Sequence, residues 1–197
     1  MIESLSSQQK QELSSASISV PEFSLQGRKI WVKVVGVYDA DTCRVVLYLG
    51  DTLTQFNVRL TGIDTPEMRP SRNKPNRDIE KKKAIQARNR LITLVSDVQI
   101  SPDSHSRKKT IQNLLAKNNK LVVLECGDFD KYGRLLGRIK ITRPTTVGGG
   151  SDGGGNGVGD CDSGCEGEAE IDVNNILIKE GFARKYDGGK KIPWTWD

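Results

Sequence analysis

One short run of the chain places an arginine, two carboxylates and a threonine close together at the end of a strand-like segment. In residues 58–67, apolar and polar side chains alternate as in a half-buried strand until a proline interrupts the pattern. Arg59, Asp64, Thr65 and Glu67 lie within this run. Arginine is suited to holding a phosphate, and carboxylates are suited to holding a hard metal ion. The run therefore indicates phosphate chemistry assisted by a divalent cation.

Two other segments carry compatible chemistry. Residues 34–47 are typical of two strands around a short acidic turn, and Asp39 and Asp41 lie two positions apart in it, so they can point the same way on an extended chain. Residues 130–138 are typical of a polar turn that leads into a strand, with Gly133 free to adopt a left-handed conformation. Taken singly, the first segment would be a solvated hairpin tip and the second an ordinary turn.

The order of the three segments resembles the staphylococcal nuclease (thermonuclease) family. That family carries Asp-Gly-Asp-Thr, then Arg-x-x-x-x-Asp-Thr-Pro-Glu, then Asp-x-Tyr-Gly-Arg. This chain has the second pattern in full at 59–67 and the third at 130–134, while Ala40 stands where the family usually has glycine in the first. The resemblance extends from about Lys29 to Trp194, apart from two insertions.

The expected elements agree with the fold that this resemblance implies. Three strands, a helix, two strands and a short helix are typical of a five-stranded OB-fold barrel, an α+β and mainly β fold with two or three short helices. The expected strands are 30–38, 42–48, 54–63, 121–125 and 135–141, and the expected helices are 77–96 and 173–180. The family usually has a longer C-terminal helix, where this chain has Trp194 and Trp196, which we expect to cover part of the core.

Phosphodiester hydrolysis gives each residue of the motifs a role. Asp41 and Asp64 would bind the metal through their side chains and Thr65 through its backbone carbonyl. Glu67 would act as general base, while Arg59 and Arg134 would flank the phosphate. The resemblance implies the same roles, and it also implies calcium as the activator, cleavage of both DNA and RNA, and 3′-phosphate products.

Further residues are candidates for binding the substrate or supporting the metal. Asp39 would support the metal site from behind the ligands. Tyr132 is either a base-stacking surface or a turn tyrosine. Tyr186 matches a family position that lines the nucleotide pocket, with a spacing one residue shorter, and is otherwise a packing tyrosine. Lys74 belongs to a basic stretch after the motif that we expect to contact backbone phosphates.

The composition is that of a soluble globular protein that can bind a polyanion. Hydrophobic residues make up 36% of the 197 residues and charged residues 28%, and the formal net charge is +5. No stretch is apolar enough to span a membrane, and the N-terminus lacks the pattern of a secretory signal. We expect an intracellular monomer, in the cytoplasm or the nucleus, whose partner is DNA or RNA and which has no protein or membrane partner.

The remaining segments are expected to lie outside the packed domain. Residues 1–26 are interpreted as a disordered N-terminal tail with some helix near 8–13, and 27–197 as the nuclease-like domain. Residues 100–120 are a polar, basic insertion, and 143–167 are a flexible glycine-rich insertion. Cys161 and Cys165 lie in the second insertion, and too few other ligands are available for a zinc site.

Two alternatives to a nuclease remain at this stage. A catalytically inactive domain of the same family would bind nucleic acid or protein, but we would expect it to have lost the carboxylates or arginines. An unrelated OB-fold that binds single strands would need exposed aromatic residues in its strands, and these strands have few. A zinc enzyme is disfavoured because His105 is the only histidine.

Overall fold

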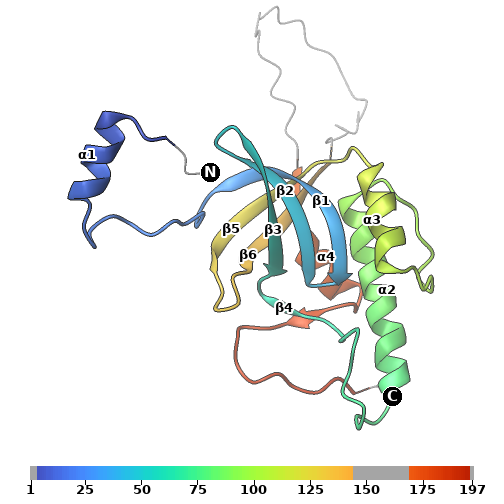
Figure 1. Ribbon diagram of the computed structural model, residues 1–197. Coiled ribbons are helices and arrows are strands. Elements are labelled where there is room, and N and C mark those ends of the chain that lie inside the picture. The colour runs from blue at the N-terminus through green and yellow to red at the C-terminus, as the bar shows by residue number, and fades with distance from the viewer. Residues whose placement is uncertain (1–3, 144–168, 196–197) are drawn as a thin grey trace, which may run out of the picture.

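Five strands close into a small barrel in the computed structural model, which describes residues 4–143 and 169–195. The strands are β1 (Lys29–Asp39), β2 (Thr42–Leu49), β3 (Thr52–Leu60), β5 (Val122–Phe129) and β6 (Leu135–Arg143). They pair antiparallel in the order β3-β2-β1-β5-β6, and a parallel pairing of β3 with β6 closes the barrel (Figure 1). The predicted five-stranded barrel of the OB type is therefore confirmed. A further strand, β7 (Ala169–Asp172), extends the sheet beside β6.

The closure of the barrel depends on a close approach between β5 and β6 at Gly137. A Cβ atom at this position would lie 2.8 Å from the carbonyl oxygen of Glu125 and 2.9 Å from the side chain of Leu124. Because no larger residue fits without displacing β5, glycine is required here. The carbonyl oxygen of Gly137 accepts a hydrogen bond of 2.9 Å from the backbone N–H of Thr61, which ties the end of β3 to β6.

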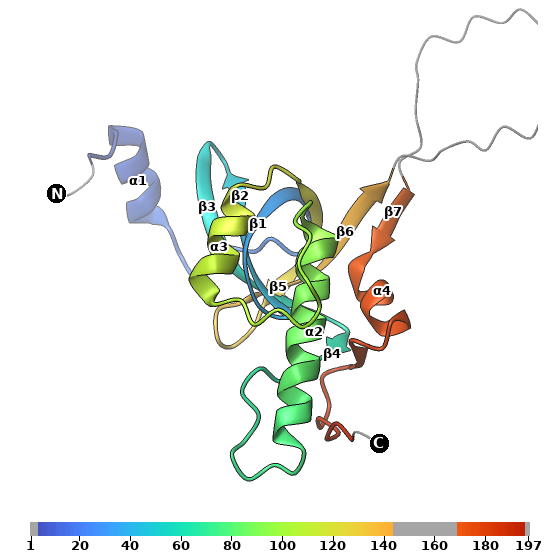
Figure 2. The ribbon, with the colours of Figure 1, turned by 90° about the vertical axis from the view of Figure 1, so that its right-hand side faces the viewer.

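Helices cover one side and one end of the barrel. The helix α2 (Arg77–Val95) and the helix α3 (Lys108–Ala116) both pack against β1 (Figure 2). The helix α4 (Val173–Lys179) packs against β6, and the carboxylate of Asp172 caps it by accepting a hydrogen bond from the N–H of Asn174. The core between barrel and helices holds fully buried residues such as Leu60, Leu91, Leu124, Leu135, Ile139 and Leu177.

Two features of the helices differ from the expectation of two or three short ones. The described residues form four helices, and α2 has 19 residues. The helix α3 lies in the segment 100–120 that was interpreted as a polar insertion. Its residues Ile111 and Leu115 are one helical turn apart and are both buried, so a single apolar stripe is enough to hold it on the barrel.

A small second sheet joins parts of the chain that are far apart in sequence. The strand β4 (Ile63–Asp64) pairs antiparallel with β8 (Arg184–Lys185), so that Asp64 lies opposite Arg184. The turn before β4 depends on Gly62, whose φ of 79° is in the left-handed region. This pairing brings the C-terminal segment to the end of β3.

The N-terminal region is joined to the barrel only near residue 25. The helix α1 (Ser7–Ser15) stands away from the barrel in both views and has no buried residue (Figures 1 and 2). Leu25 is fully buried, so packing begins slightly before residue 27. The glycine-rich tract predicted at 143–167 lies almost entirely outside the described residues, as does Trp196. Within the described chain, no helix is long and apolar enough to cross a membrane.

Candidate active site

The first part of the site is a buried carboxylate held by an arginine and two threonines. Asp41 follows β1 and is 3% exposed. The guanidinium of Arg59, on β3, forms an ion pair with Asp41 Oδ1. The hydroxyls of Thr42 and Thr65 donate hydrogen bonds of 3.0 Å to the two carboxylate oxygens. The register of β2 with β3 places Thr42 opposite Arg59, which explains why residues 18 positions apart meet here.

The second part is centred on Asp64, which is 1% exposed. Arg184 donates two hydrogen bonds to its Oδ2, of 3.1 Å from Nε and 2.8 Å from Nη2. The ammonium of Lys191 lies 2.9 Å from Oδ1 and 2.8 Å from Glu67 Oε1. Burial by itself would raise the pKa of Asp64, but the contacts with Lys191 and Arg184 outweigh it and hold the pKa below its usual value.

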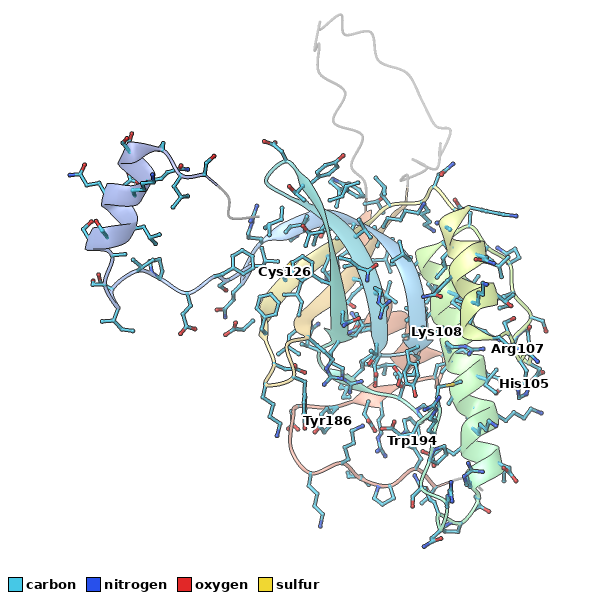
Figure 3. The ribbon with its side chains drawn as sticks, in the orientation of Figure 1. His105, Arg107, Lys108, Cys126, Tyr186 and Trp194 are labelled. Carbon is cyan, nitrogen blue, oxygen red and sulfur yellow. The ribbon has the colours of Figure 1, made fainter. Side chains whose placement is uncertain are left out.

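Arg184 and Lys191 are the functional candidates that the sequence patterns did not reveal. Both belong to the C-terminal segment, and only the pairing of β4 with β8 brings them to Asp64. The guanidinium of Arg184 also stacks on the ring of Trp194, with 4.4 Å between its carbon and the ring centroid. Figure 3 shows Trp194 at this lower end of the molecule. The only signal in the sequence was the mixture of basic and aromatic residues.

Asp39 has a buried oxygen, Oδ1, with no hydrogen-bond donor and no ion pair among the described residues. Asp64 Oδ1 also accepts no hydrogen bond, but the ammonium of Lys191 lies 2.9 Å from it. Asp39 is 7% exposed. Burial is the main reason that its pKa is raised to about 6, and the nearby charge of Glu67 acts in the same direction. Arg59 and Lys191 oppose this effect only in part. Asp39 is therefore a costly group to keep ionised unless a further positive charge is present.

Arg134 reaches the cluster from the turn between β5 and β6. Its side chain pairs with Asp130, with 2.8 Å from Nε and 2.7 Å from Nη2 to Oδ2. The exposed ring of Tyr132 lies beside this guanidinium, 5.5 Å from its carbon to the ring centroid. Burial lowers the pKa of Arg59, and the positive charge of Arg134 lowers it further. The charge of Arg134 therefore acts on Arg59, although the guanidinium of Arg134 is itself paired with Asp130.

Lys74 and Glu67 are both tied to a buried glutamate of α2. The ammonium of Lys74 lies 2.6 Å from Glu80 Oε2, and Glu80 is completely buried. The backbone N–H of Glu67 donates a hydrogen bond of 3.3 Å to Glu80 Oε1. Lys74 thus lies beside the site, with its charge already paired inside the protein.

Tyr186 lies next to the cluster but does not line the same cavity. Its hydroxyl donates a hydrogen bond of 2.7 Å to the carbonyl of Gly189, and its N–H donates to the carbonyl of Gly62. It lines a cavity of about 810 Å³ with residues of α4 and β8. Asp64, Glu67 and Lys191 line a separate cavity of about 170 Å³. Tyr186 and Trp194 occupy the same end of the molecule (Figure 3).

The donor set of the cluster fits a hard divalent cation better than a soft one. Asp41 and Asp64 supply carboxylate oxygens, and Asp39 has an oxygen without a hydrogen-bond donor. Neither histidine nor cysteine is needed, and the described residues hold no group of three or more His, Cys, Asp or Glu arranged around one point. A cation at Asp64 would have to replace the ammonium of Lys191, which already lies between Asp64 and Glu67.

The fold and the cluster together define an OB-type barrel with arginines and carboxylates gathered at one end. The family model of the staphylococcal nuclease homologues matches residues 57–192, which is more than half of the chain. The chain therefore belongs to the staphylococcal nuclease family. The match includes Arg59, Asp64, Glu67 and Arg134, whereas Asp41 lies before it. A search of curated proteins found no match.

Proposed function

We propose that this protein is a calcium-dependent endonuclease that hydrolyses phosphodiester bonds of DNA and RNA and leaves 3′-phosphate ends. The observation that carries the proposal is the position of Arg59, which is paired with Asp41 and lies within the electrostatic reach of Asp64, Glu67 and Arg134. Family membership supports the same conclusion, because the family model describes nuclease homologues.

The residues that would hold the calcium ion are Asp41, Asp64 and the backbone carbonyl of Thr65. When bound, the ion would neutralise charge on the phosphate and lower the pKa of a nearby water. Asp39 would not bind the ion directly, and its negative charge would support the ligands that do. The buried oxygen of Asp39 that has no donor among the described residues favours a cation nearby.

The arginines and the glutamate would carry out the rest of the reaction. Arg59 and Arg134 would each donate hydrogen bonds to non-bridging oxygens of the phosphate. Glu67 would take a proton from the attacking water, whose oxygen forms a bond to phosphorus while the bond from phosphorus to the 5′ oxygen breaks. The 5′ oxygen would take up a proton from solvent. Lys191 would have to leave Glu67 first, because its ammonium lies 2.8 Å from Oε1, an oxygen that would accept the proton.

One observation favours the alternative of a catalytically inactive domain that binds nucleic acid or protein. Each of Asp41, Asp64 and Glu67 is already paired with a cationic side chain of the protein. If these ion pairs never open, the cluster only stabilises the fold. If they open, the side chains are available for a metal ion and a phosphate.

Two measurements on the intact chain separate these readings. Cleavage of an end-labelled single-stranded oligonucleotide is followed with calcium, magnesium, zinc or chelator, and the thermal midpoint is recorded under the same conditions. We expect cleavage only with calcium, and a midpoint that rises with calcium concentration because the ion binds the folded state. Cleavage in chelator, or neither cleavage nor stabilisation with calcium, would contradict the proposal.

A further inference from the structure

A second region of positive charge lies on the helical side of the barrel. A groove of about 770 Å³ runs between β1 and β2 on one side and α2, α3 and the segment 68–72 on the other. Seven of its lining residues are lysine or arginine, and none of the described residues that line it is acidic. The cations come from separate parts of the chain, with Arg44 on β2, Arg72 after the motif, Lys81 and Arg88 on α2, and Lys108 on α3.

The most informative of these cations is Arg88, because it is buried without a counter-charge. It is 6% exposed. Its guanidinium donates hydrogen bonds to the side-chain oxygen of Asn89 and to the carbonyl of Ser104, and no described carboxylate forms an ion pair with it. Burial lowers the pKa of Arg88. A buried cation that faces a groove and has only neutral partners is expected to favour an anion there.

The beginning of α3 gives an independent indication of an anion. The helix has no side-chain cap at Arg107 and no acidic residue in its first turn, where Lys108 and Lys109 stand instead. Cations at the positive end of a helix dipole are unfavourable, and an anion at the same place would be favourable. Figure 3 shows Arg107 and Lys108 at this end of α3, and Lys108 lines the groove.

The groove also begins next to the candidate active site. Its lining includes Thr42, which follows Asp41, and Met68, which follows Glu67. Tyr38 lies in its wall, with 48% of its surface exposed, and offers a face on which a base can stack. A strand of nucleic acid that leaves the site in this direction would meet cations from β2, α2 and α3 in turn.

We propose that this groove binds the backbone phosphates of a single nucleic acid strand beyond the bond that is cut. This inference rests on the proposed function for its substrate, but it assigns to the groove a binding role that the active-site residues do not need. The phosphates of the bound strand would neutralise the charge of Arg88 and the positive start of α3. Release of the counterions that surround these phosphates in solution would drive binding. A regular row of phosphates matches cations that are spread along a groove. A single small anion would contact only a few of these cations.

The test uses two double variants that remove the same charge. Lys81→Gln with Lys108→Gln removes two groove cations, both on exposed side chains. Lys10→Gln with Lys117→Gln removes two exposed lysines that do not line the groove. Binding of a fluorescein-labelled 20-residue oligothymidylate is measured in chelator, where no cleavage is expected, as a function of salt. Equal thermal midpoints for the two variants confirm that both are folded.

We expect the groove variant to bind roughly 10–30-fold more weakly at 0.1 M salt, and its salt slope to be smaller by about 1.4, because each phosphate contact on a single strand contributes about 0.7. The control variant should stay within about threefold of the parent protein. Equal losses of affinity for the oligonucleotide in the two variants would overturn the proposal. Displacement of the oligonucleotide by polyglutamate at equal charge concentration would also overturn it, as would tighter binding of a duplex than of a single strand.

Cleavage by the same proteins with calcium separates this inference from the proposed function. A groove variant that cleaves a dinucleotide at the parent rate but a 20-residue strand more slowly supports both. Loss of binding in the groove variant, in a protein that never cleaves, supports the groove alone. Cleavage by the parent protein with no difference between the two variants supports the nuclease and overturns the groove.

Discussion

The active-site cluster and the groove differ in whether their charged side chains are paired within the protein. In the cluster, Asp41 is paired with Arg59, and Asp64 is paired with both Arg184 and Lys191. In the groove, seven cations line the surface and none of the described lining residues is acidic. A cluster that neutralises itself keeps its side chains in place without a ligand, whereas a groove with unbalanced charge is most stable with a partner. Chemistry and strand binding are therefore expected to be separable by mutation.

The largest expected effect comes from removing the base or the phosphate-binding arginine of the cluster. Glu67→Gln should lower single-turnover cleavage by about 10²–10⁴-fold, because it removes basicity and keeps the size of the side chain. Arg134→Ala should lower it by roughly 10²–10³-fold, the cost of one preorganised donor. Binding of the labelled oligonucleotide in chelator should change little for either. Cleavage at the parent rate by both saturated variants would show that the chemistry is elsewhere.

The ion pair between Lys74 and Glu80 tests whether a lysine beside the site serves the fold or the substrate. Lys74→Met leaves the fully buried carboxylate of Glu80 without its partner at 2.6 Å. We expect a loss of about 3–5 kcal/mol in the free energy of unfolding, measured with denaturant at pH 7. Adding Glu80→Gln to this variant should restore a large part of the loss. If stability is unchanged and only salt-dependent binding weakens, Lys74 contacts phosphate as the sequence suggested.

Asp39 tests whether the cluster costs stability when no cation is bound. Its pKa of about 6 in the folded protein lies above the ordinary value of 3.8 for an aspartate, so the folded state holds its proton more tightly. Stability is therefore lost as the pH rises from about 4 through 6, and Asp39→Asn avoids this loss. In chelator at pH 8, the variant should be more stable than the parent by roughly 1–3 kcal/mol. At pH 4 the two should be nearly equal, and equal stability at both pH values would show that Asp39 is not strained.

Local patterns were sufficient to predict the barrel and the residues of its motifs. Alternating side chains marked the strands, and the run 59–67 carried its arginine, carboxylates and threonine within one turn and strand end. The close contact of Asp41 with Arg59 then follows from the register of β2 with β3, which places Thr42 opposite Arg59. Residues that are near in sequence or on paired strands can be placed in this way.

Contacts made by distant segments could not be predicted in this way. Arg184 and Lys191 reach Asp64 only because β8 pairs with β4, and these strands have two residues each. The helix α3 was missed because its apolar residues are few in a basic segment, although Ile111 and Leu115 bury the face that matters. Both the self-neutralised cluster and the unbalanced groove depend on these long-range contacts.

The smallest effect is expected from replacing the tract that joins β6 to β7, because the paired strand ends that it connects, Arg143 and Ala169, lie at the other end of β6 from the turn of Arg134. Arg143 and Ala169 are paired across the two strands, so a short turn can connect them directly. Arg143 is also at the opposite end of β6 from Leu135, the residue after Arg134, about 27 Å along a strand of nine residues. Replacing 144–168 by Asn-Gly should leave cleavage and the salt slope of binding unchanged. The free energy of unfolding should rise by no more than about 1–2 kcal/mol, because a shorter loop costs less entropy to close. Calorimetry and the two binding assays check this. A loss of more than about 3 kcal/mol, which is typical of damage to a core, would show that the tract packs on the barrel, and a changed salt slope would extend the nucleic acid surface to this end of the sheet.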